Sequence, residues 1–343
     1  MKTPNHILVL RLSAMGDVAM TVPVLRVLAQ TYPELRITLI SRPAFAPLFE
    51  DIPNLTFLEA DVYGKHKGTG LLTLAKQAKK MQVDAVADLH NVIRSKVITN
   101  YLSVQGVRTA AIDKGRKEKK ALVRKNNKKF RQLKSTHQRY AEVFAELGLP
   151  VQLSDHRFPE RRPLTPRLHS LIGKEPKKCI GIAPFAAYKS KAYPFEKMKQ
   201  VMQGLDEKEQ YRIFLFGGGE EEISILKDVE LEFTSVTNIA GNLTFDEELG
   251  LISNLDLMIS MDSGNGHLAA MFGIPVITLW GVTHPFAGFT PFGQPEGNSL
   301  LADREQFPLI PTSVYGNKYP TGYDKAIASI SPETVLSKAL EIL

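Results

Sequence analysis

The sequence predicts an α/β protein made of two doubly wound halves, each with a parallel sheet. Short apolar runs, typical of strands buried on both faces, alternate with amphipathic helical stretches along nearly the whole chain. With 343 residues, 43% of them hydrophobic, the chain is long enough to bury two ordinary cores. Between the two series, residues 151–178 carry several prolines and little periodicity, as a linker does.

The first series contains five short runs that read as buried strands. These are residues 6–11, 36–41, 55–58, 85–89 and 107–112. A helix is expected to follow Asp17, with Pro23 in its first turns, where a missing N–H costs little. Further helices are expected at 44–50, 71–80, 92–102 and 138–147.

The second series repeats this alternation. Its strands are expected at 179–184, 212–216, 236–238, 255–259 and 276–279. Its helices are expected at 195–205, from the glycine run 217–219 through residue 227, at 245–253, at 267–272 and at 332–343. The last of these has Ser331 as a good N-cap and Pro332 at its first position.

These elements define an expected domain organisation. We expect an N-terminal domain at 1–170, a C-terminal domain at 171–330, and a C-terminal helix at 331–343 that packs back on the N-terminal domain. Two βα-rich halves joined by a linker imply a ligand cleft between them. No period of 20–50 residues repeats, which excludes a solenoid.

Basic residues are concentrated in one segment. Residues 114–134 hold eleven Lys or Arg and one Glu, a local charge of +10 in a chain whose total is +7. One interpretation is a solvated, mobile loop. The other is a patch for a polyanion such as nucleic acid, an anionic lipid surface or a phosphorylated glycolipid. The residues expected to carry this anionic surface are Lys117, Lys119, Lys120, Arg124 and Lys128.

The sequence favours the cytoplasm as the compartment. The single cysteine, Cys179, excludes an internal disulfide framework and a cysteine-based metal cluster. The apolar run 7–10 is too short for the core of a signal peptide. No run approaches the roughly 18 apolar residues that spanning a bilayer requires.

The segment 255–279 predicts an anion site. A buried strand ends in the polar loop DSGNGH at 262–267, and a short helix follows that closes at Gly273 before Pro275. Glycines in such a loop permit close backbone approach, and the N–H groups that begin the helix favour negative charge, most often phosphate. Two other strand-end loops of this half could converge on it, one with Lys191 and one with 217–222. Together they describe a pocket for a nucleotide diphosphate.

Asp17 has two interpretations. A carboxylate in the first turn of a helix complements the helix dipole, which by itself explains an aspartate here. It also stands at the carboxyl end of the first strand, where open α/β sheets bind their ligands, so it is a candidate general base. His90, at the end of the fourth strand, is a further candidate, although a lone histidine is more often structural.

Three motifs carry a resemblance to a known family. RLSAMGDV at 11–18, KAYP at 191–194, and DSGNGH at 262–267 with the following AAMFGIPVITLWGVTHP resemble glycosyltransferase family 9, the ADP-heptose:lipopolysaccharide heptosyltransferases. The likeness runs in order over nearly the whole chain. It implies the GT-B fold, in which two Rossmann-like domains face a cleft, and inverting transfer without a covalent intermediate.

The resemblance also assigns roles to individual residues. Asp17 matches the family's catalytic base, and Lys191 matches the lysine that contacts the donor diphosphate. The donor loop is matched by Asp262, Ser263, Gly264 and His267. For the acidic residue near the donor ribose, Glu220 is the first candidate, with Glu221 and Glu222 as alternatives. One departure is Ala186-Ala187, where some heptosyltransferases carry two threonines whose hydroxyls hold phosphate.

The resemblance implies a substrate pair and a place in the cell. The donor is expected to be a nucleoside-diphosphate sugar, ADP-heptose first, and the acceptor a lipopolysaccharide core or lipid A-type phosphorylated glycolipid. We expect a monomer in the cytoplasm, peripheral on the cytoplasmic face of the inner membrane, without a tightly bound cofactor, a metal site or a nucleic-acid partner. No Asp-x-Asp triplet of the kind that would hold a catalytic metal is present.

Two alternative functions remain at this point. One is a nucleotide-sugar epimerase of the same fold, which would turn over its donor without an acceptor. The other is a nucleic-acid-binding protein, suggested by the charge of 114–134. That segment has one aromatic residue, Phe130, and so lacks the repeated stacking platforms of single-strand binders.

Overall fold

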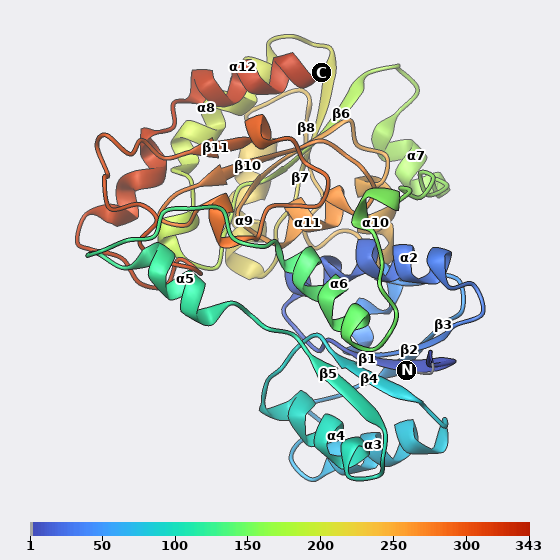
Figure 1. Cartoon of the computed structure of the whole chain (residues 1–343). Coiled ribbons are helices and arrows are strands. Elements are labelled where there is room, and N and C mark those ends of the chain that lie inside the picture. Colours follow the sequence, from blue (N-terminus) through green and yellow to red (C-terminus); the bar gives the residue numbers. More distant parts are fainter. Residues whose placement is uncertain (1–2) are drawn as a thin grey trace. The chain divides into compact units, whose positions relative to one another are not determined.

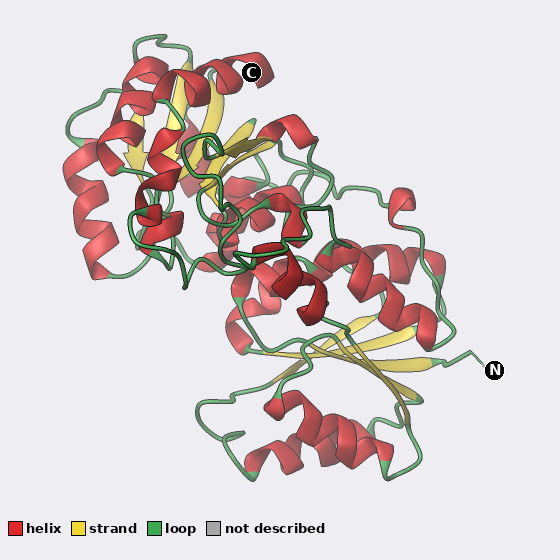
Figure 2. Cartoon of the chain, turned by 60° about the vertical axis from the view of Figure 1, so that its left-hand side comes forward, coloured by secondary structure: helices red, strands yellow, loops and turns green. Residues whose placement is uncertain are grey.

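The computed structural model describes residues 3–343, which form two compact units. Unit 1 comprises Met1–Lys114 and Lys134–Phe158, and unit 2 comprises Gly115–Leu133 and Pro159–Leu343. In each unit, helices cover both faces of an open sheet whose paired strands all run parallel (Figure 2). The predicted class, α/β with two parallel sheets, is therefore confirmed.

The sheet of unit 1 has the strand order β3-β2-β1-β4-β5 (Figure 1). Its strands are β1 (His6–Leu10), β2 (Arg36–Ser41), β3 (Leu55–Glu59), β4 (Ala85–Asp88) and β5 (Arg108–Ala111). Its helices are α1 (Met15–Ala19), α2 (Thr21–Thr31), α3 (Gly70–Lys80), α4 (Ile93–Ser103) and α6 (Thr136–Glu146), with 3₁₀ turns at Pro43–Leu48 and Leu153–Asp155. The order reverses between β1 and β4, and ligands of open α/β sheets bind outside the carboxyl ends of strands at such a reversal.

The spacing of apolar residues along the sequence explains where the helices of unit 1 form. On α3 the buried side chains are Leu71, Leu74, Ala75 and Ala78, the i, i+3, i+4, i+7 pattern of one helix face. Helix α6 begins two residues earlier than expected because Ser135 and Gln138 form a reciprocal capping box. The expected first helix is divided in the structure into α1 and α2 around Met20.

The sheet of unit 2 has the order β11-β10-β9-β6-β7-β8. Its strands are β6 (Lys178–Ala183), β7 (Tyr211–Leu215), β8 (Val236–Asn238), β9 (Leu257–Met261), β10 (Val276–Trp280) and β11 (Ser299–Leu301). Its α-helices are α5 (Arg116–Val123), α7 (Pro166–Ile172), α8 (Phe195–Asp206), α9 (Glu220–Glu230), α10 (Phe245–Ile252), α11 (Gly264–Ala270) and α12 (Pro332–Ile342). Four 3₁₀ turns complete the described part of this unit, at Lys189–Lys191, Pro285–Ala287, Glu296–Asn298 and Tyr323–Ser329.

The polar loop after β9 begins directly at Asp262, because the strand lies two residues later than expected. Asp256 precedes the strand, and its carboxylate accepts a hydrogen bond from the N–H of Cys179 at 2.8 Å. Helix α11 then begins at Gly264, three residues earlier than expected. A Cβ at Gly266 would lie 2.6 Å from the Ser260 hydroxyl, so this glycine lets α11 pack tightly on β9.

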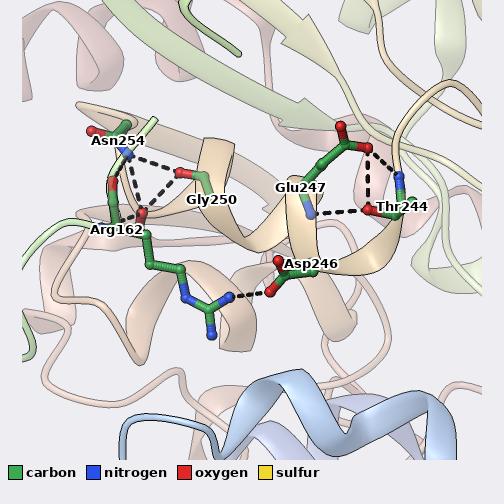
Figure 3. A network of polar contacts seen from close by, with 7 residues as sticks. Arg162, Thr244, Asp246, Glu247, Gly250 and Asn254 are labelled. Carbon is green, nitrogen blue, oxygen red and sulfur yellow. Dashed lines mark hydrogen bonds and ion pairs between the residues drawn. The ribbon is translucent and has the colours of Figure 1, made fainter. Parts of the chain in front are cut away.

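The boundary between the units differs from the expected one at residue 170. Residues from Pro159 onward belong to unit 2, where the chain around Arg162 is anchored on α10 (Figure 3). The Arg162 guanidinium pairs with Asp246 at 2.7 Å, and the backbone N–H of Arg162 donates to the Ser253 hydroxyl at 3.0 Å. The Asn254 amide donates to the carbonyls of Arg162 and Gly250 at 2.9 and 2.8 Å. These bonds explain why a proline-rich stretch with little periodicity is still part of the second unit.

Two further segments belong to unit 2 where we had expected otherwise. The basic residues Gly115–Leu133 pack within it, and so does α12, which we expected on the N-terminal domain. Val335 and Ala339 of α12 are buried in the same core cluster as Val201 and Leu205 of α8. Helix α12 therefore completes the hydrophobic layer over α8.

Candidate active site

Asp17 is held by a buried arginine. It lies on α1, which follows β1, and its Oδ2 is 2.6 Å from Nη2 of Arg11. The Arg11 side chain is 6% exposed and that of Asp17 is 32% exposed. The Tyr140 hydroxyl donates to the Asp17 carbonyl at 3.2 Å, and burial raises the pKa of Tyr140 far above its ordinary value, which keeps this donor protonated. Asp17 therefore has a fixed orientation and a partly accessible carboxylate.

This carboxylate lies at the reversal of strand order in unit 1. Arg11 follows β1 directly and donates through Nη1 to the carbonyl of Leu89, which follows β4, at 2.8 Å. The next residue, His90, accepts a hydrogen bond from the N–H of Leu12 at its Nδ1, at 3.4 Å. Burial, together with the charge of Arg11, lowers the pKa of His90 to about 3. His90 is therefore a neutral, structural ring at neutral pH.

Unit 2 brings Lys191 and Asp262 together as predicted. Lys191 ends the 3₁₀ turn that follows β6, and Asp262 follows β9, the neighbouring strand. The Lys191 Nζ lies 3.0 Å from Asp262 Oδ2, and the two side chains are 14% and 10% exposed. The strand order of this unit also reverses between β6 and β9, so the pair lies where a ligand is expected.

Two glycines that the sequence did not indicate hold this lysine. Gly316 has φ +87°, and a Cβ there would lie 2.6 Å from Cδ of Lys191. The preceding residue, Ser190, is buried and donates to the Gly316 carbonyl at 2.6 Å. A Cβ at Gly281 would lie 2.3 Å from the Ser190 carbonyl. Gly316 lies in an irregular loop and Gly281 directly follows β10, and only the tertiary structure shows the contacts that give them this role.

The rest of the predicted donor loop lies beside Asp262. Ser263 is the N-cap of α11 with an extended backbone, and its side chain makes no capping hydrogen bond. Gly264 is the first helical residue, and His267 lies half-buried one turn further on. These residues therefore follow Asp262 within one short helix.

The three candidate glutamates are in the first turn of α9 and differ in their contacts. Glu222 Oε2 accepts a hydrogen bond from the N–H of Gly218 at 2.8 Å, so this carboxylate serves the loop itself. Glu220 and Glu221 are exposed. Because β7 is paired with β6, the loop that they follow lies beside the one that carries Lys191.

The basic segment is ordered, and its predicted surface residues separate into two groups. Lys119 is buried, with its Nζ 3.9 Å from the ring centroid of Phe289. Lys128 Nζ donates to the carbonyls of Pro311, at 2.6 Å, and Leu309, and burial lowers its pKa to about 8. These two lysines are structural, which differs from the expectation. The exposed members of the predicted set are Lys117, Lys120 and Arg124.

Two features are absent from the described part of the chain, residues 3–343. No group of three or more His, Cys, Asp or Glu side chains there is arranged to hold a metal ion. No helix there has both the length and the hydropathy that a bilayer span requires.

Comparisons with known proteins identify the family. A family model described as glycosyltransferase family 9 (heptosyltransferase) matches residues 71–309. The lipopolysaccharide core heptosyltransferase OpsX of Haemophilus influenzae is 27% identical over 298 residues, which are 83% of this chain and 81% of that protein.

Solved structures agree on the fold. A family 9 glycosyl transferase from Veillonella parvula superposes with a TM-score of 0.77 at 19% identity, covering 100% of this chain and 98% of that one. The ADP-heptose lps heptosyltransferase II of E. coli superposes with a TM-score of 0.68 at 17% identity, covering 98% of each chain. These likenesses confirm the predicted GT-B fold. Because the family model covers well over half of the sequence, the chain belongs to glycosyltransferase family 9, the heptosyltransferase family, and is a glycosyltransferase.

Proposed function

We propose that this enzyme transfers a heptose from ADP-heptose to a lipopolysaccharide core acceptor, with inversion at the anomeric carbon. The observation that carries the proposal is the match to family 9 over residues 71–309. The relative OpsX is named for the lipopolysaccharide core, and the E. coli neighbour is named for ADP-heptose. Epimerase and nucleic-acid-binding functions are less favoured, because neither explains this match.

Donor binding is assigned to unit 2. Lys191, fixed by Asp262, places a positive charge at the strand-order reversal, where it would meet the diphosphate. The N–H groups of Ser263 and Gly264 would add hydrogen bonds to the departing ADP. Preorganised donors of this kind contribute about 10²–10³-fold in rate each. Glu220 or Glu221 would take the ribose hydroxyls, and His267 would complete the donor loop.

Acceptor activation is assigned to Asp17. Arg11 binds one carboxylate oxygen, Oδ2, and we assign the reaction to the other, Oδ1. That oxygen would take the proton of the acceptor hydroxyl while the hydroxyl oxygen attacks the anomeric carbon from the face opposite the diphosphate. A single displacement of this kind inverts the configuration and forms no bond between sugar and enzyme.

The acceptor explains the charge of the chain. Exposed basic residues such as Lys117, Lys120 and Arg124 would meet the phosphates of the glycolipid or of a membrane surface. We place the enzyme at the cytoplasmic face of the inner membrane, where such an acceptor would be presented, acting as a monomer and without a tightly bound cofactor.

A donor panel tests the proposal. Purified enzyme is given ADP-heptose, or UDP- and GDP-linked sugars, with heptose-deficient lipopolysaccharide as acceptor, and products are measured by mass spectrometry. We expect transfer from ADP-heptose, with the anomeric configuration inverted by NMR. Turnover of the donor to an isomer without acceptor would instead establish the epimerase. Salt-dependent duplex binding with no transfer would favour the nucleic-acid function.

A further inference from the structure

Unit 2 contains a basic hollow that the proposed donor site does not use. It lies between α5 and the loop at 312–318 and has a volume of about 340 Å³. Its charged lining residues are Arg116, Lys119, Lys120 and Lys318, and no acidic residue lines it. We propose that this hollow binds a phosphate-bearing sugar of the acceptor and so selects phosphorylated glycolipid, an inference that rests on the proposed function.

The exposed charges of the hollow are available to a ligand. Lys120 and Lys318 are exposed, and neither forms an ion pair within the part of the chain that the structure describes. Lys119 is held over Phe289, so its charge is fixed at the wall. Positive charges gathered in a concave site concentrate an anion there.

The lining of the hollow also contains a neutral hydrogen-bond donor. The Ser313 hydroxyl accepts the N–H of Gly316 at 2.9 Å and donates to Oδ1 of Asn317 at 3.4 Å. Both Ser313 and Asn317 line the hollow. The Ser313 contact uses the amide oxygen of Asn317, and its Nδ2 group is a hydrogen-bond donor. Oxyanions accept from cations and neutral donors alike, so this set suits phosphate.

The size and the chemistry of the hollow indicate more than a free ion. Pockets for small organic ligands have volumes of about 300–1,000 Å³, so a cavity of about 340 Å³ accommodates a sugar ring with its phosphate. An adjoining hollow of about 210 Å³ shares Val123, Thr312 and Lys318 with it. Leu309 and Pro320 line that second space, which continues the site as a partly apolar surface.

The hollow is connected to the proposed donor site through one loop. Gly316 lies between Ser313 and Asn317, and the same glycine packs against the side chain of Lys191. Thr312 is tied by its N–H to the carbonyl of Val282, beyond the end of β10, at 3.0 Å. The wall of the hollow and the lysine assigned to the diphosphate are therefore set by one stretch of chain. A ligand in the hollow would lie at the same edge of the sheet as the donor.

The test compares two acceptors and two variants. Heptose-deficient lipopolysaccharide is used intact or after its phosphates are removed with hydrofluoric acid, and KM and kcat are measured with ADP-heptose. The site variant is Lys120→Gln/Lys318→Gln. The charge-matched control is Lys129→Gln/Lys227→Gln, two exposed lysines that line neither hollow.

We expect the site variant to raise KM for the intact acceptor by about tenfold or more, because a hydrogen bond to a charged group contributes on that order. Its KM for the dephosphorylated acceptor and its kcat should stay within about twofold of wild type, as should every constant of the control. Equal KM increases for both acceptors, or none, would overturn the proposal.

Two more measurements keep this result separate from the proposed function. Binding of glucosamine 1-phosphate is followed by NMR, and its loss in the site variant alone would support the hollow even if neither acceptor were glycosylated. Retained binding in that variant would overturn it. Co-sedimentation with phosphatidylglycerol vesicles tests the other source of phosphate. If the variant loses vesicle binding but keeps wild-type acceptor discrimination, the hollow is a membrane contact and the acceptor proposal fails.

Discussion

The ammonium group of Lys191 lies 3.0 Å from Oδ2 of Asp262, and the two residues follow neighbouring parallel strands. Both side chains are almost fully buried. Removing one member of such a pair leaves an uncompensated buried charge, which costs about 3–5 kcal/mol. Replacing both by neutral groups costs less, because no charge is then left unpaired.

A double-mutant cycle on stability should therefore show strong coupling. We expect Asp262→Asn to lower the thermal midpoint clearly, and Lys191→Met/Asp262→Asn to recover part of the loss, with a coupling energy of about 1–3 kcal/mol. Thermal and urea unfolding of the four proteins measures it. If the two single effects simply add, the pair contributes nothing beyond its individual side chains.

Asp17 is tested by the loss of transfer without the loss of donor binding. Asp17→Asn keeps the shape of the side chain but not its basicity, so we expect kcat to fall by about 10²–10⁴-fold. ADP should still stabilise the variant in a thermal-shift assay. The control is Asp51→Asn, which breaks a comparable pair with Arg26 (2.7 Å) in the same unit. Near wild-type transfer by Asp17→Asn would remove Asp17 from the mechanism.

Gly316 should control ADP affinity through Lys191. Alanine at Gly316 must adopt φ +87° and displace the lysine side chain, whose Cδ would lie 2.6 Å from the new Cβ. Gly322 has a similar φ of +84° with nothing within 4 Å, so Gly322→Ala is a matched control for backbone strain. Both variants should lose about 1–2 kcal/mol of stability.

Calorimetric titration with ADP separates the two glycine variants. We expect Gly316→Ala to weaken ADP binding about tenfold, the loss of roughly one charge-assisted hydrogen bond. Gly322→Ala should bind as wild type does. Equal affinities in both variants would show that the position of Lys191 does not matter for ADP.

Sequence alone could predict the main part of the candidate site because its residues follow strands. Lys191 and Asp262 each come after a buried apolar run, and the carboxyl ends of parallel strands meet at one edge. The roles of Gly281 and Gly316 could not be found in this way. They depend on contacts with Ser190 and Lys191 that the sequence does not encode locally, although Gly281 directly follows β10.

The basic segment 114–134 shows that the fold, too, depends on contacts that the sequence does not reveal. Residues 116–123 have the sequence RKEKKALV, whose charge predicts solvent exposure rather than a packed helix. The structure nevertheless buries Leu122 in a cluster with Leu133 and Ala287. Ala287, against which Leu122 packs in this cluster, lies more than 150 residues further along the chain. No local sequence pattern encodes a contact over such a separation.

Lys128 should be important for stability although it belongs to a basic, mostly exposed segment. Its ammonium group donates to two backbone carbonyls of unit 2, and burial lowers its pKa to about 8. Lys128→Met would leave those carbonyls without this donor, so we expect a loss of about 1–3 kcal/mol. Lys129→Met, at an exposed neighbour, is the control. Thermal unfolding of both variants checks the difference, and equal midpoints would contradict it.

His90 should make the stability of the protein fall in acid. Burial, with Arg11 as the next cause, lowers its folded pKa from 6.5 to about 3. Between about pH 6.5 and about pH 3, the unfolded chain therefore binds a proton that the folded chain does not bind. The contribution of His90 to stability is fully present above this window and declines as pH falls through it. Between pH 7 and pH 5 the loss of stability attributable to this group is about 2 kcal/mol.

We expect His90→Gln to unfold with a flatter pH dependence over that range, whatever its stability at pH 7. The control is His169→Gln, at an exposed position, which should keep the wild-type slope. Urea titrations at several pH values measure both slopes, and an unchanged slope in His90→Gln would mean that the imidazole is protonated in the folded protein.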